Sequence, residues 1–200
     1  MVSPEPLTAL APPPGLLSSE LDDLGVTLGP DGGTLRVWSA HASEIELVVF
    51  DFDGVFTDNR VWTNEQGEES VACWRGDALG LRRLEDVGVD HFVLSMEVNA
   101  AVGARARKIR AACIQGVDDK PPVLREEVAK RGVSLDRTAY VGNDVNDAGC
   151  LEIVGLPVVP ADAWPDVVPL AGIVLERRGG YGCVREFCDA VWNAKRAVAA

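Results

Sequence analysis

The stretch VVFDFDGVFTDN, residues 48–59, places two aspartates and a glycine directly after an apolar run. Asp51 and Asp53 are separated by one residue, and Gly54 follows them. Carboxylates crowded at the end of a buried strand repel one another, so something positive must offset their charge. Carboxylate oxygens are suitable ligands for a hard cation such as Mg²⁺. The spacing therefore predicts a loop that binds a metal ion.

Other polar side chains follow apolar runs farther along the chain. These are Ser95 after DHFVL, Lys120 just before a proline pair that favours a helix start, and Asn143, Asp144 and Asp147 after TAYVG. A hydroxyl, an ammonium group and a second acidic cluster thus accompany the two aspartates. An ammonium group near the carboxylates would compensate part of their negative charge.

The elements that must position these residues alternate between strands and helices. Strands are predicted at 44–50, 90–95, 111–116, 138–142, 156–160 and 172–176. Helical patterns lie near 77–87, 98–110, 121–131, 146–154 and 163–169, and a longer one runs from near 182 to the end. Strands separated by helices of this length form a parallel sheet with helices on both faces. We expect an α/β fold, a three-layer Rossmann-like parallel sheet.

Residues 58–77 depart from this alternation. They are predicted as a β-hairpin that turns at Gln66-Gly67, and this two-stranded flap follows the first strand directly. In open parallel sheets, ligands bind beyond the carboxyl ends of the strands. The polar residues named above should therefore converge at one edge of the sheet.

Such a set of residues meets the requirements of phosphoryl transfer. An aspartate attacks phosphorus and forms an aspartyl-phosphate, while a second acid two residues on protonates the leaving oxygen and then activates water. A cation such as Mg²⁺ lets the anionic nucleophile approach the phosphate. A hydroxyl and a lysine hold the remaining phosphate oxygens, and Gly54 lets the backbone turn closely around them.

The composition limits the other possibilities. The chain has 200 residues, 47% of them hydrophobic, enough for one core of ordinary size. Its net charge of −12 argues against binding to nucleic acid or to an anionic membrane surface. The five cysteines are scattered without a CxxC pair, which favours reduced thiols, and no apolar run approaches the length of a membrane span. We expect a cytoplasmic protein.

The motifs DFDGVFTD, Ser95 after its strand, Lys120 and GNDVND, in that order, resemble the haloacid dehalogenase superfamily of phosphatases. Over residues 46–192, the flap and the segments RGDALGLRRL, LSMEVN, VGNDVNDAGCLEIVGLPVVPADA and RRGGYGCVREFCDAV are similar to one branch of it. That branch contains 3-deoxy-manno-octulosonate 8-phosphate phosphatase, its nonulosonate 9-phosphate relatives and the C-terminal domain of some acylneuraminate cytidylyltransferases. The resemblance implies an Mg²⁺-dependent phosphatase that acts on a small acidic sugar phosphate, of ulosonate or nonulosonate type.

The resemblance also assigns roles to individual residues. Asp51 would be the nucleophile and a metal ligand, and Asp53 the general acid/base whose backbone carbonyl binds the metal. The phosphate would be held by Ser95 and Lys120, together with the backbone at Gly54.

Two positions depart from the family pattern. The third metal ligand falls at Asn143, where the family commonly has aspartate, and Asp144 or Asp147 would assist it as auxiliary ligands. An amide oxygen binds Mg²⁺ without adding charge. Met96-Glu97 replaces the Gly-Arg that is common after this strand in the octulosonate enzymes, which leaves the identity of the sugar open.

The spacing of the motifs excludes a cap domain. Residues 54–94 have room only for the flap and one helix with its strand, and residues 96–119 only for a helix and a strand. An uncapped site is wet and unselective unless a neighbouring subunit closes it. Relatives in this family are tetramers in which the flap and the C-terminal segment contact adjacent subunits, so we expect a homotetramer.

The remaining assignments concern the flap exit and the N-terminus. Arg75 and Asp77 could be a helix cap with an exposed cation, or could contact substrate as similar family residues do. Residues 1–23 are predicted as a disordered proline-rich tail. Residues 24–43 are predicted as a β extension that resembles a fragment of the β-sandwich module of glycogen debranching and branching enzymes. The phosphatase domain would span 44–198.

Two other functions were weighed against the phosphatase. A non-catalytic oligomerisation or regulatory domain, of the acylneuraminate cytidylyltransferase type, is favoured mildly by Asn143 but disfavoured by the complete set of Asp51, Asp53, Ser95 and Lys120. A phospho-accepting receiver domain would place no acid two residues beyond the accepting aspartate and would leave the flap unexplained.

Overall fold

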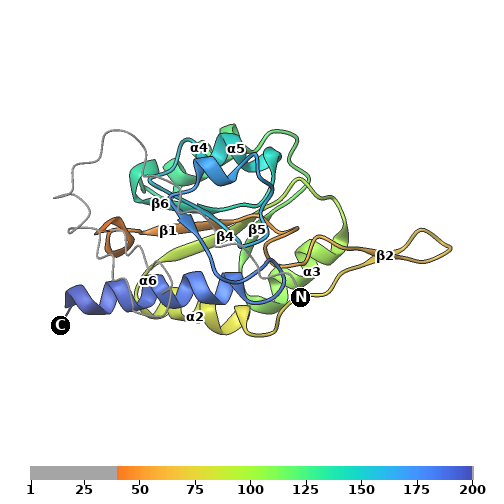
Figure 1. The fold of residues 1–200 in the computed structure, drawn as a ribbon, viewed down its shortest axis with the longest axis horizontal. Helices are drawn as coiled ribbons and strands as arrows, with labels where there is room; N and C mark the ends of the chain where they lie inside the picture. Colours follow the sequence, from red (N-terminus) through yellow and green to blue (C-terminus); the bar gives the residue numbers. More distant parts are fainter. Residues whose placement is uncertain (1–39, 200) are drawn as a thin grey trace, which may run out of the picture. The chain divides into compact units, whose positions relative to one another are not determined.

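The computed structural model describes residues 40–199. Its central feature is a six-stranded sheet in which all neighbouring strands run parallel (Figure 1). In spatial order the strands are β5 (Ala112–Ile114), β4 (Asp90–Leu94), β1 (Leu47–Phe50), β6 (Thr138–Val141), β7 (Leu156–Val159) and β8 (Ile173–Val174). The predicted α/β parallel sheet is confirmed.

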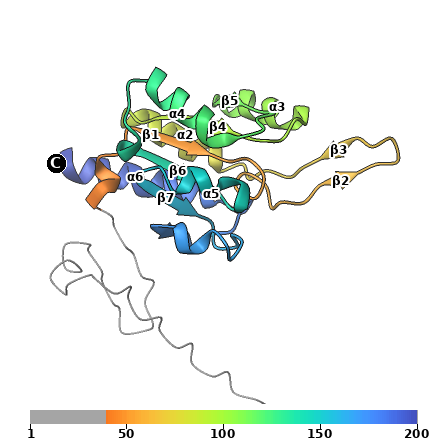
Figure 2. The ribbon, with the colours of Figure 1, turned by 90° about the horizontal axis from the view of Figure 1, so that it is seen from above.

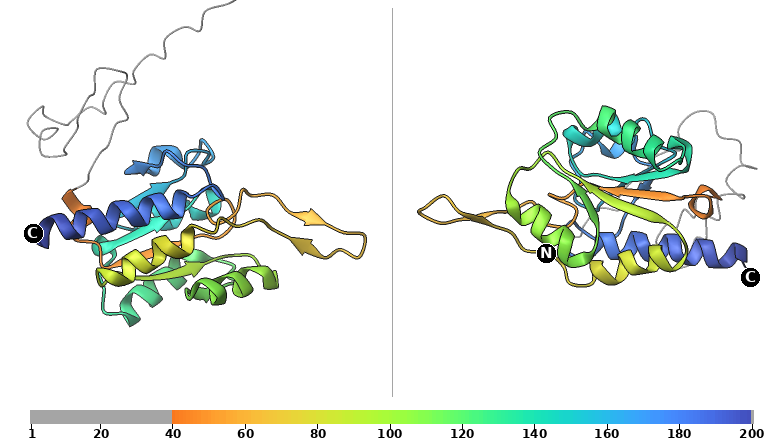
Figure 3. Two further views of the ribbon diagram at one scale, coloured as in Figure 1. Left: turned by 90° about the horizontal axis from the view of Figure 1, so that it is seen from below. Right: turned by 180° about the vertical axis from the view of Figure 1, so that it is seen from behind.

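Helices cover both faces of this sheet, giving three layers (Figures 1 and 3). On one face lie α2 (Asp77–Asp86), α3 (Ala100–Ile109) and α6 (Cys183–Ala199). On the other face lie α4 (Lys120–Lys130) and α5 (Ala148–Leu151). Each face of the sheet thus forms its own hydrophobic cluster with the helices that cover it.

Strand β1 explains why its sequence is a continuous apolar run. Val48 and Phe50 belong to the cluster under α2 and α6, whereas Leu47 and Val49 belong to the cluster under α4 and α5. Successive side chains of a strand point to opposite faces, so a strand that is covered on both sides needs apolar residues at every position.

The flap is a β-hairpin of β2 (Trp62–Thr63) and β3 (Glu69–Ser70), and it extends away from the sheet (Figure 2). Gly67 adopts a φ of +78° in its turn, a conformation that glycine adopts without strain. The Nη2 atom of Arg105 donates a hydrogen bond of 2.7 Å to the carbonyl of Trp74, which holds the returning segment of the flap on α3. The predicted flap is confirmed.

The absence of a cap domain is also confirmed for the described residues. Between β1 and β4 the chain forms only the flap and α2, and between β4 and β5 it forms only α3. Along residues 40–199, no helix is both long enough and apolar enough to span a membrane.

Two predicted helices differ from the structure. The helix predicted at 146–154 is a 3-10 turn, η3 (Val145–Asp147), followed by the short α5. The helix predicted at 163–169 is reduced to a 3-10 turn, η4 (Val168–Leu170), because Pro165 and Pro169 lack the N–H groups that a helix requires. Residues 24–39 of the predicted β extension lie outside the described residues, and its last residues form a 3-10 turn, η1 (Ala40–Ser43).

Candidate active site

The site residues meet at the carboxyl edge of the sheet. Asp51 follows β1 directly, Ser95 follows β4, and Asn143 lies two residues beyond β6. Lys120 is the first residue of α4, in the connection that leaves β5. Because the chain passes from β1 to β4 on one side and later reaches β6 on the other, this edge is the switch point where ligands of such sheets bind.

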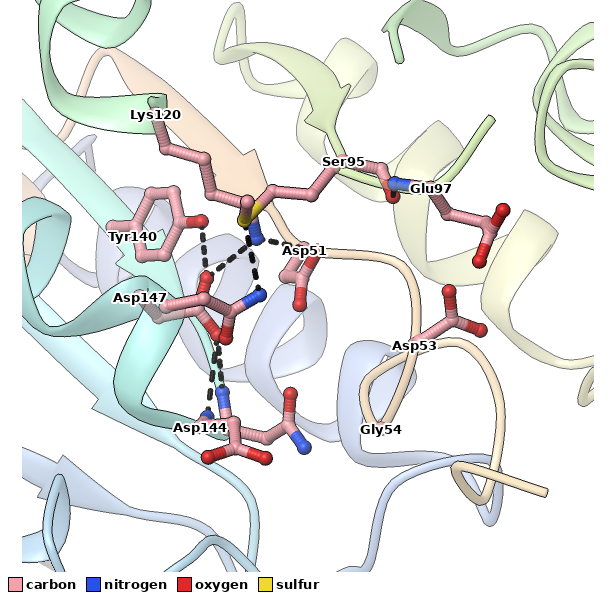
Figure 4. A network of polar contacts seen from close by, with 12 residues as sticks. Asp51, Asp53, Gly54, Ser95, Glu97, Lys120, Tyr140, Asp144 and Asp147 are labelled. Carbon is pink, nitrogen blue, oxygen red and sulfur yellow. Dashed lines mark hydrogen bonds and ion pairs between the residues drawn. The ribbon is translucent and has the colours of Figure 1, made fainter. Parts of the chain in front are cut away.

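Lys120 links two acidic side chains at this edge (Figure 4). Its Nζ atom lies 2.8 Å from Oδ1 of Asp51 and 2.7 Å from Oδ1 of Asp147. Burial alone would lower the pKa of Lys120, but the two carboxylates raise it above its ordinary value. The lysine therefore remains an ammonium group although its side chain is fully buried.

Burial has a large effect on the pKa of Asp51. Removal from water raises the pKa of Asp51 to about 7, and repulsion from Asp147 acts in the same direction, while Lys120 opposes both. A cation bound at this carboxylate would favour its deprotonated form. The electrostatics of the site thus suit a ligand that brings positive charge.

Asp147 organises the surrounding chain through both of its carboxylate oxygens. Besides Lys120, the hydroxyl of Tyr140 donates a hydrogen bond of 2.7 Å to Oδ1. The backbone N–H groups of Asn143 and Asp144 donate to Oδ2, at 2.8 Å and 3.3 Å. The loop after β6 is therefore fixed by the same side chain that positions Lys120.

Tyr140 was not among the residues predicted from sequence. It lies in an apolar strand and is fully buried, so its position resembles that of any core aromatic residue. The signal that could have identified it is its hydroxyl, because a buried tyrosine usually finds a hydrogen-bond partner.

The loop that carries Asp53 is held by its own side chains. The hydroxyl of Thr57 donates to Oδ1 of Asp53 at 3.2 Å, and it accepts a hydrogen bond from the N–H of Gly54 at 3.2 Å. Burial raises the pKa of Asp53, the hydrogen bond from Thr57 opposes this rise, and repulsion from Glu97 adds to it. Asp53 is only partly buried, which keeps its carboxyl group accessible.

Ser95 and Glu97 form the opposite side of the site. The Ser95 hydroxyl oxygen is buried and accepts a hydrogen bond of 3.1 Å from the N–H of Glu97. In Figure 4 the carboxylates of Glu97 and Asp53 lie near each other, away from Lys120. The sequence-predicted residues Asp51, Asp53, Ser95 and Lys120 are thus brought to one place.

The donors available for a metal ion are oxygen atoms of three kinds. A Cβ atom on Gly54 would lie 2.0 Å from the side-chain nitrogen of Asn143, so the Asn143 amide lies against the loop that carries Asp53. The Asp51 carboxylate, the Asp53 carbonyl and the Asn143 amide form a mixed oxygen set that is compatible with Mg²⁺.

The other acidic residues of the second cluster have contacts of their own. Within the described part of the chain, His, Cys, Asp and Glu side chains form no group of three arranged to hold a metal ion. Both oxygens of Asp147 accept hydrogen bonds from the protein, and Oδ1 of Asp144 accepts one from the N–H of Val145 at 2.7 Å. An auxiliary metal role for Asp144 and Asp147 stays a prediction.

Arg75 and Asp77 lie apart from this set. Arg75 is exposed, whereas Asp77 is buried at the start of α2 and neither of its carboxyl oxygens has a hydrogen-bond partner among the described residues. Burial raises the pKa of Asp77 to about 7, with Arg105 opposing. No hydrogen bond or ion pair of the described chain joins either residue to Asp51, Ser95 or Lys120, so their substrate role also stays a prediction.

A pair of glycines that sequence reasoning did not place at the site packs on the loop after Asp53. The N–H of Gly180 donates to the carbonyl of Val55 at 3.0 Å. A Cβ atom on Gly179 would lie 1.9 Å from the carbonyl oxygen of Gly54, so no other residue fits there without a shift of the backbone. The C-terminal part of the chain thus supports the loop from behind.

Comparisons with known proteins are consistent with this geometry. No family model matches the sequence. Over 156 residues the chain is 33% identical to the 3-deoxy-D-manno-octulosonate 8-phosphate phosphatase of Yersinia pestis, covering 78% of this chain and 83% of that protein.

Two solved structures have the same fold and detectable sequence identity. A haloacid dehalogenase family hydrolase of Streptomyces avermitilis is 40% identical, with a TM-score of 0.73 over 78% of this chain and 89% of that one. The 3-deoxy-D-manno-octulosonate 8-phosphate phosphatase of Moraxella catarrhalis, whose crystal structure contains a magnesium ion, a phosphate ion and KDO, is 28% identical. Its TM-score is 0.75, over 80% of this chain and 92% of that one.

Proposed function

The chain belongs to the family of 3-deoxy-D-manno-octulosonate 8-phosphate phosphatases within the haloacid dehalogenase superfamily, and we propose that it hydrolyses the phosphate monoester of a small sugar acid. The enzymes of this family are phosphoric monoester hydrolases. The substrate that we propose is of ulosonate or nonulosonate type. The observation that carries the proposal is the position of Lys120 between Asp51 and Asp147, with Ser95 at the same edge of the sheet.

In the proposed mechanism, Asp51 attacks the phosphorus atom and becomes an aspartyl-phosphate. Asp53 protonates the leaving sugar oxygen and then takes a proton from the water that releases phosphate. Lys120 and Ser95 hold phosphate oxygens while charge redistributes, together with the backbone N–H groups at Gly54. The contacts of Asp147 support this assignment, because they fix the orientation of the lysine in advance.

A divalent cation, which we propose is Mg²⁺, would be held by the Asp51 carboxylate, the Asp53 carbonyl and the Asn143 amide. When bound, it offsets the negative charges of the nucleophile and the phosphoryl group. Magnesium accompanies phosphate in the Moraxella relative. Because the amide of Asn143 contributes no charge, we expect weaker metal binding than an aspartate there would give.

We also propose that the enzyme is a homotetramer in the cytoplasm. Val61 and Trp62 on the flap are 53% and 58% exposed, and a two-stranded hairpin without packing partners is marginally stable in water. A second copy that packs against the flap would bury these residues and shield a site that has no cap. The five free thiols suit a reducing compartment. Sedimentation analysis of the wild type and of Trp62→Ser tests the assembly.

The central test of the proposed function measures phosphate release from an aryl phosphate, with and without Mg²⁺. We expect turnover that requires the metal, and a loss of about a thousandfold or more in Asp51→Asn because the covalent step needs the carboxylate. Asp86→Asn, at the far end of α2, is the matched control that removes one charge away from the site. A panel of phosphorylated ulosonates and hexoses then ranks the substrates. A folded wild-type protein without any turnover would support the non-catalytic alternative.

A further inference from the structure

Glu97 lies directly beside the group that would hold the phosphate. It is two residues beyond Ser95, and its backbone N–H donates to the Ser95 hydroxyl oxygen at 3.1 Å. Ser95 is 1% exposed, whereas Glu97 is only partly buried. The carboxylate of Glu97 lies near that of Asp53 in Figure 4, and Asp53 is the group that we propose protonates the leaving oxygen of the ester.

The position of this carboxylate is fixed by the backbone. Its Oε1 atom accepts hydrogen bonds from the N–H groups of Val98 and Asn99, at 2.7 Å and 2.8 Å. Asn99 in turn caps α3, because its side chain accepts a hydrogen bond from the N–H of Ala101 at 2.9 Å. Movement of this side chain out of the site would break both of these hydrogen bonds to the backbone just before α3.

No cationic side chain of the described residues pairs with the carboxylate of Glu97. None of the ion pairs formed within residues 40–199 involves Glu97. Its repulsion acts on Asp53, which lies near it in Figure 4, and Glu69 of the flap adds to that repulsion. The part of the site between Asp53 and Glu97 is therefore negative.

This inference rests on the proposed phosphatase function: we propose that Glu97 determines specificity by accepting hydrogen bonds from a hydroxyl or ammonium group on the carbon next to the phosphate-bearing carbon. A carboxylate is an acceptor only, so a neutral or cationic donor satisfies it. A second anion at that carbon meets an unpaired negative charge in a partly desolvated site. Glu97 thus selects esters of polyhydroxylated chains. A substrate that also carries a carboxylate must then carry it far from the ester.

The test uses two esters that differ in one group. In 2-hydroxyethyl phosphate the carbon next to the ester carbon carries a hydroxyl, and in 2-phosphoglycolate that carbon is a carboxylate. We expect kcat/KM of the wild type to favour the hydroxyl compound at least tenfold. Glu97→Gln keeps an oxygen for the two backbone N–H groups but removes the charge, so this preference falls to within about threefold.

A reversed charge gives a second, independent variant. Glu97→Lys should prefer 2-phosphoglycolate, which a purely structural role of Glu97 would not produce. Glu85→Gln is the matched control, because Glu85 belongs to the last turn of α2, beside the amino end of β4 and opposite the site. It should keep the wild-type preference. Thermal unfolding of each variant checks that it is folded.

A second pair of esters places the carboxylate at a distance. Glucitol 6-phosphate and 6-phosphogluconate differ only at the carbon farthest from the phosphate, and we expect Glu97→Gln to leave their ratio unchanged. A preference between the two short esters that is the same in the wild type, Glu97→Gln and Glu97→Lys would overturn the role of Glu97 alone. Wild-type protein that releases phosphate from none of the four esters nor from an aryl phosphate would overturn the proposed function and this inference with it.

Discussion

Asp147 is the single residue that connects Lys120 with Tyr140 in the site. Its Oδ1 atom binds both Lys120 and the Tyr140 hydroxyl, and burial raises the pKa of Tyr140 well above its usual value, so this hydroxyl remains a donor. Tyr140→Phe removes one hydrogen bond to a buried charge, which typically contributes about 2 kcal/mol. We expect the free energy of unfolding in urea to fall by about this amount. An unchanged stability in Tyr140→Phe would contradict the role of its hydroxyl.

The metal site offers a second prediction at this scale. Asn143→Asp adds a carboxylate where the amide lies against the loop of Asp53, and a charged ligand attracts Mg²⁺ more strongly. We expect the Mg²⁺ concentration for half-maximal activity to fall by about tenfold, by the Coulomb attraction of one added charge. Asn146→Asp adds the same charge on an exposed residue of the same loop and serves as the control. An equal effect of both variants would exclude Asn143 as a ligand.

Two elements, α2 and α6, pack against each other on one face of the sheet, and Gly80 lies at their contact. A Cβ atom on Gly80 would lie 3.0 Å from the Arg185 Cα atom and 3.1 Å from the Cys188 Cβ atom. Gly80→Val therefore forces the helices apart, and we expect it to lower the free energy of unfolding by about 1–3 kcal/mol. Ala104→Val, an exposed substitution in α3, should change it by less than about 0.5 kcal/mol. Equal stabilities of the two variants would show that the helix pair accommodates a side chain.

The stability of the whole molecule should depend on pH through His91. This side chain is buried on β4, neither ring nitrogen has a hydrogen-bond partner among the described residues, and burial lowers its pKa below 6.5 although Glu85 and Asp90 oppose the shift. Below pH 6.5 the unfolded chain binds a proton that the folded protein does not bind, so this contribution to stability falls as the pH falls. Between pH 7.5 and 5.5 the wild type should lose roughly 1 kcal/mol more than His91→Leu, measured by urea unfolding at both values. Parallel pH profiles would show that His91 is protonated equally in both states.

Much of the fold could be predicted because each strand carries its own pattern. The continuous apolar run of β1 required cover on both faces, and the spacing of the strands required crossovers. The prediction of a helix at 163–169 is wrong because Pro165 and Pro169 lack the N–H groups that a helix requires. Boundaries also shifted: the strand predicted from residue 44 begins at Leu47, where pairing with β4 and β6 begins.

The sequence by itself determined which residues stand at the carboxyl edge of a parallel sheet, because that edge is fixed by where each strand ends. Asp51, Ser95 and Asn143 follow β1, β4 and β6 in any such fold. Only the tertiary structure decided how these side chains are used. Asp147 is directed to Lys120 and Tyr140, Gly179 packs on the loop of Asp53, and Glu97 lies near Asp53. These relations join segments far apart in the chain, and the packing that creates them leaves no periodic signal in any one of those segments.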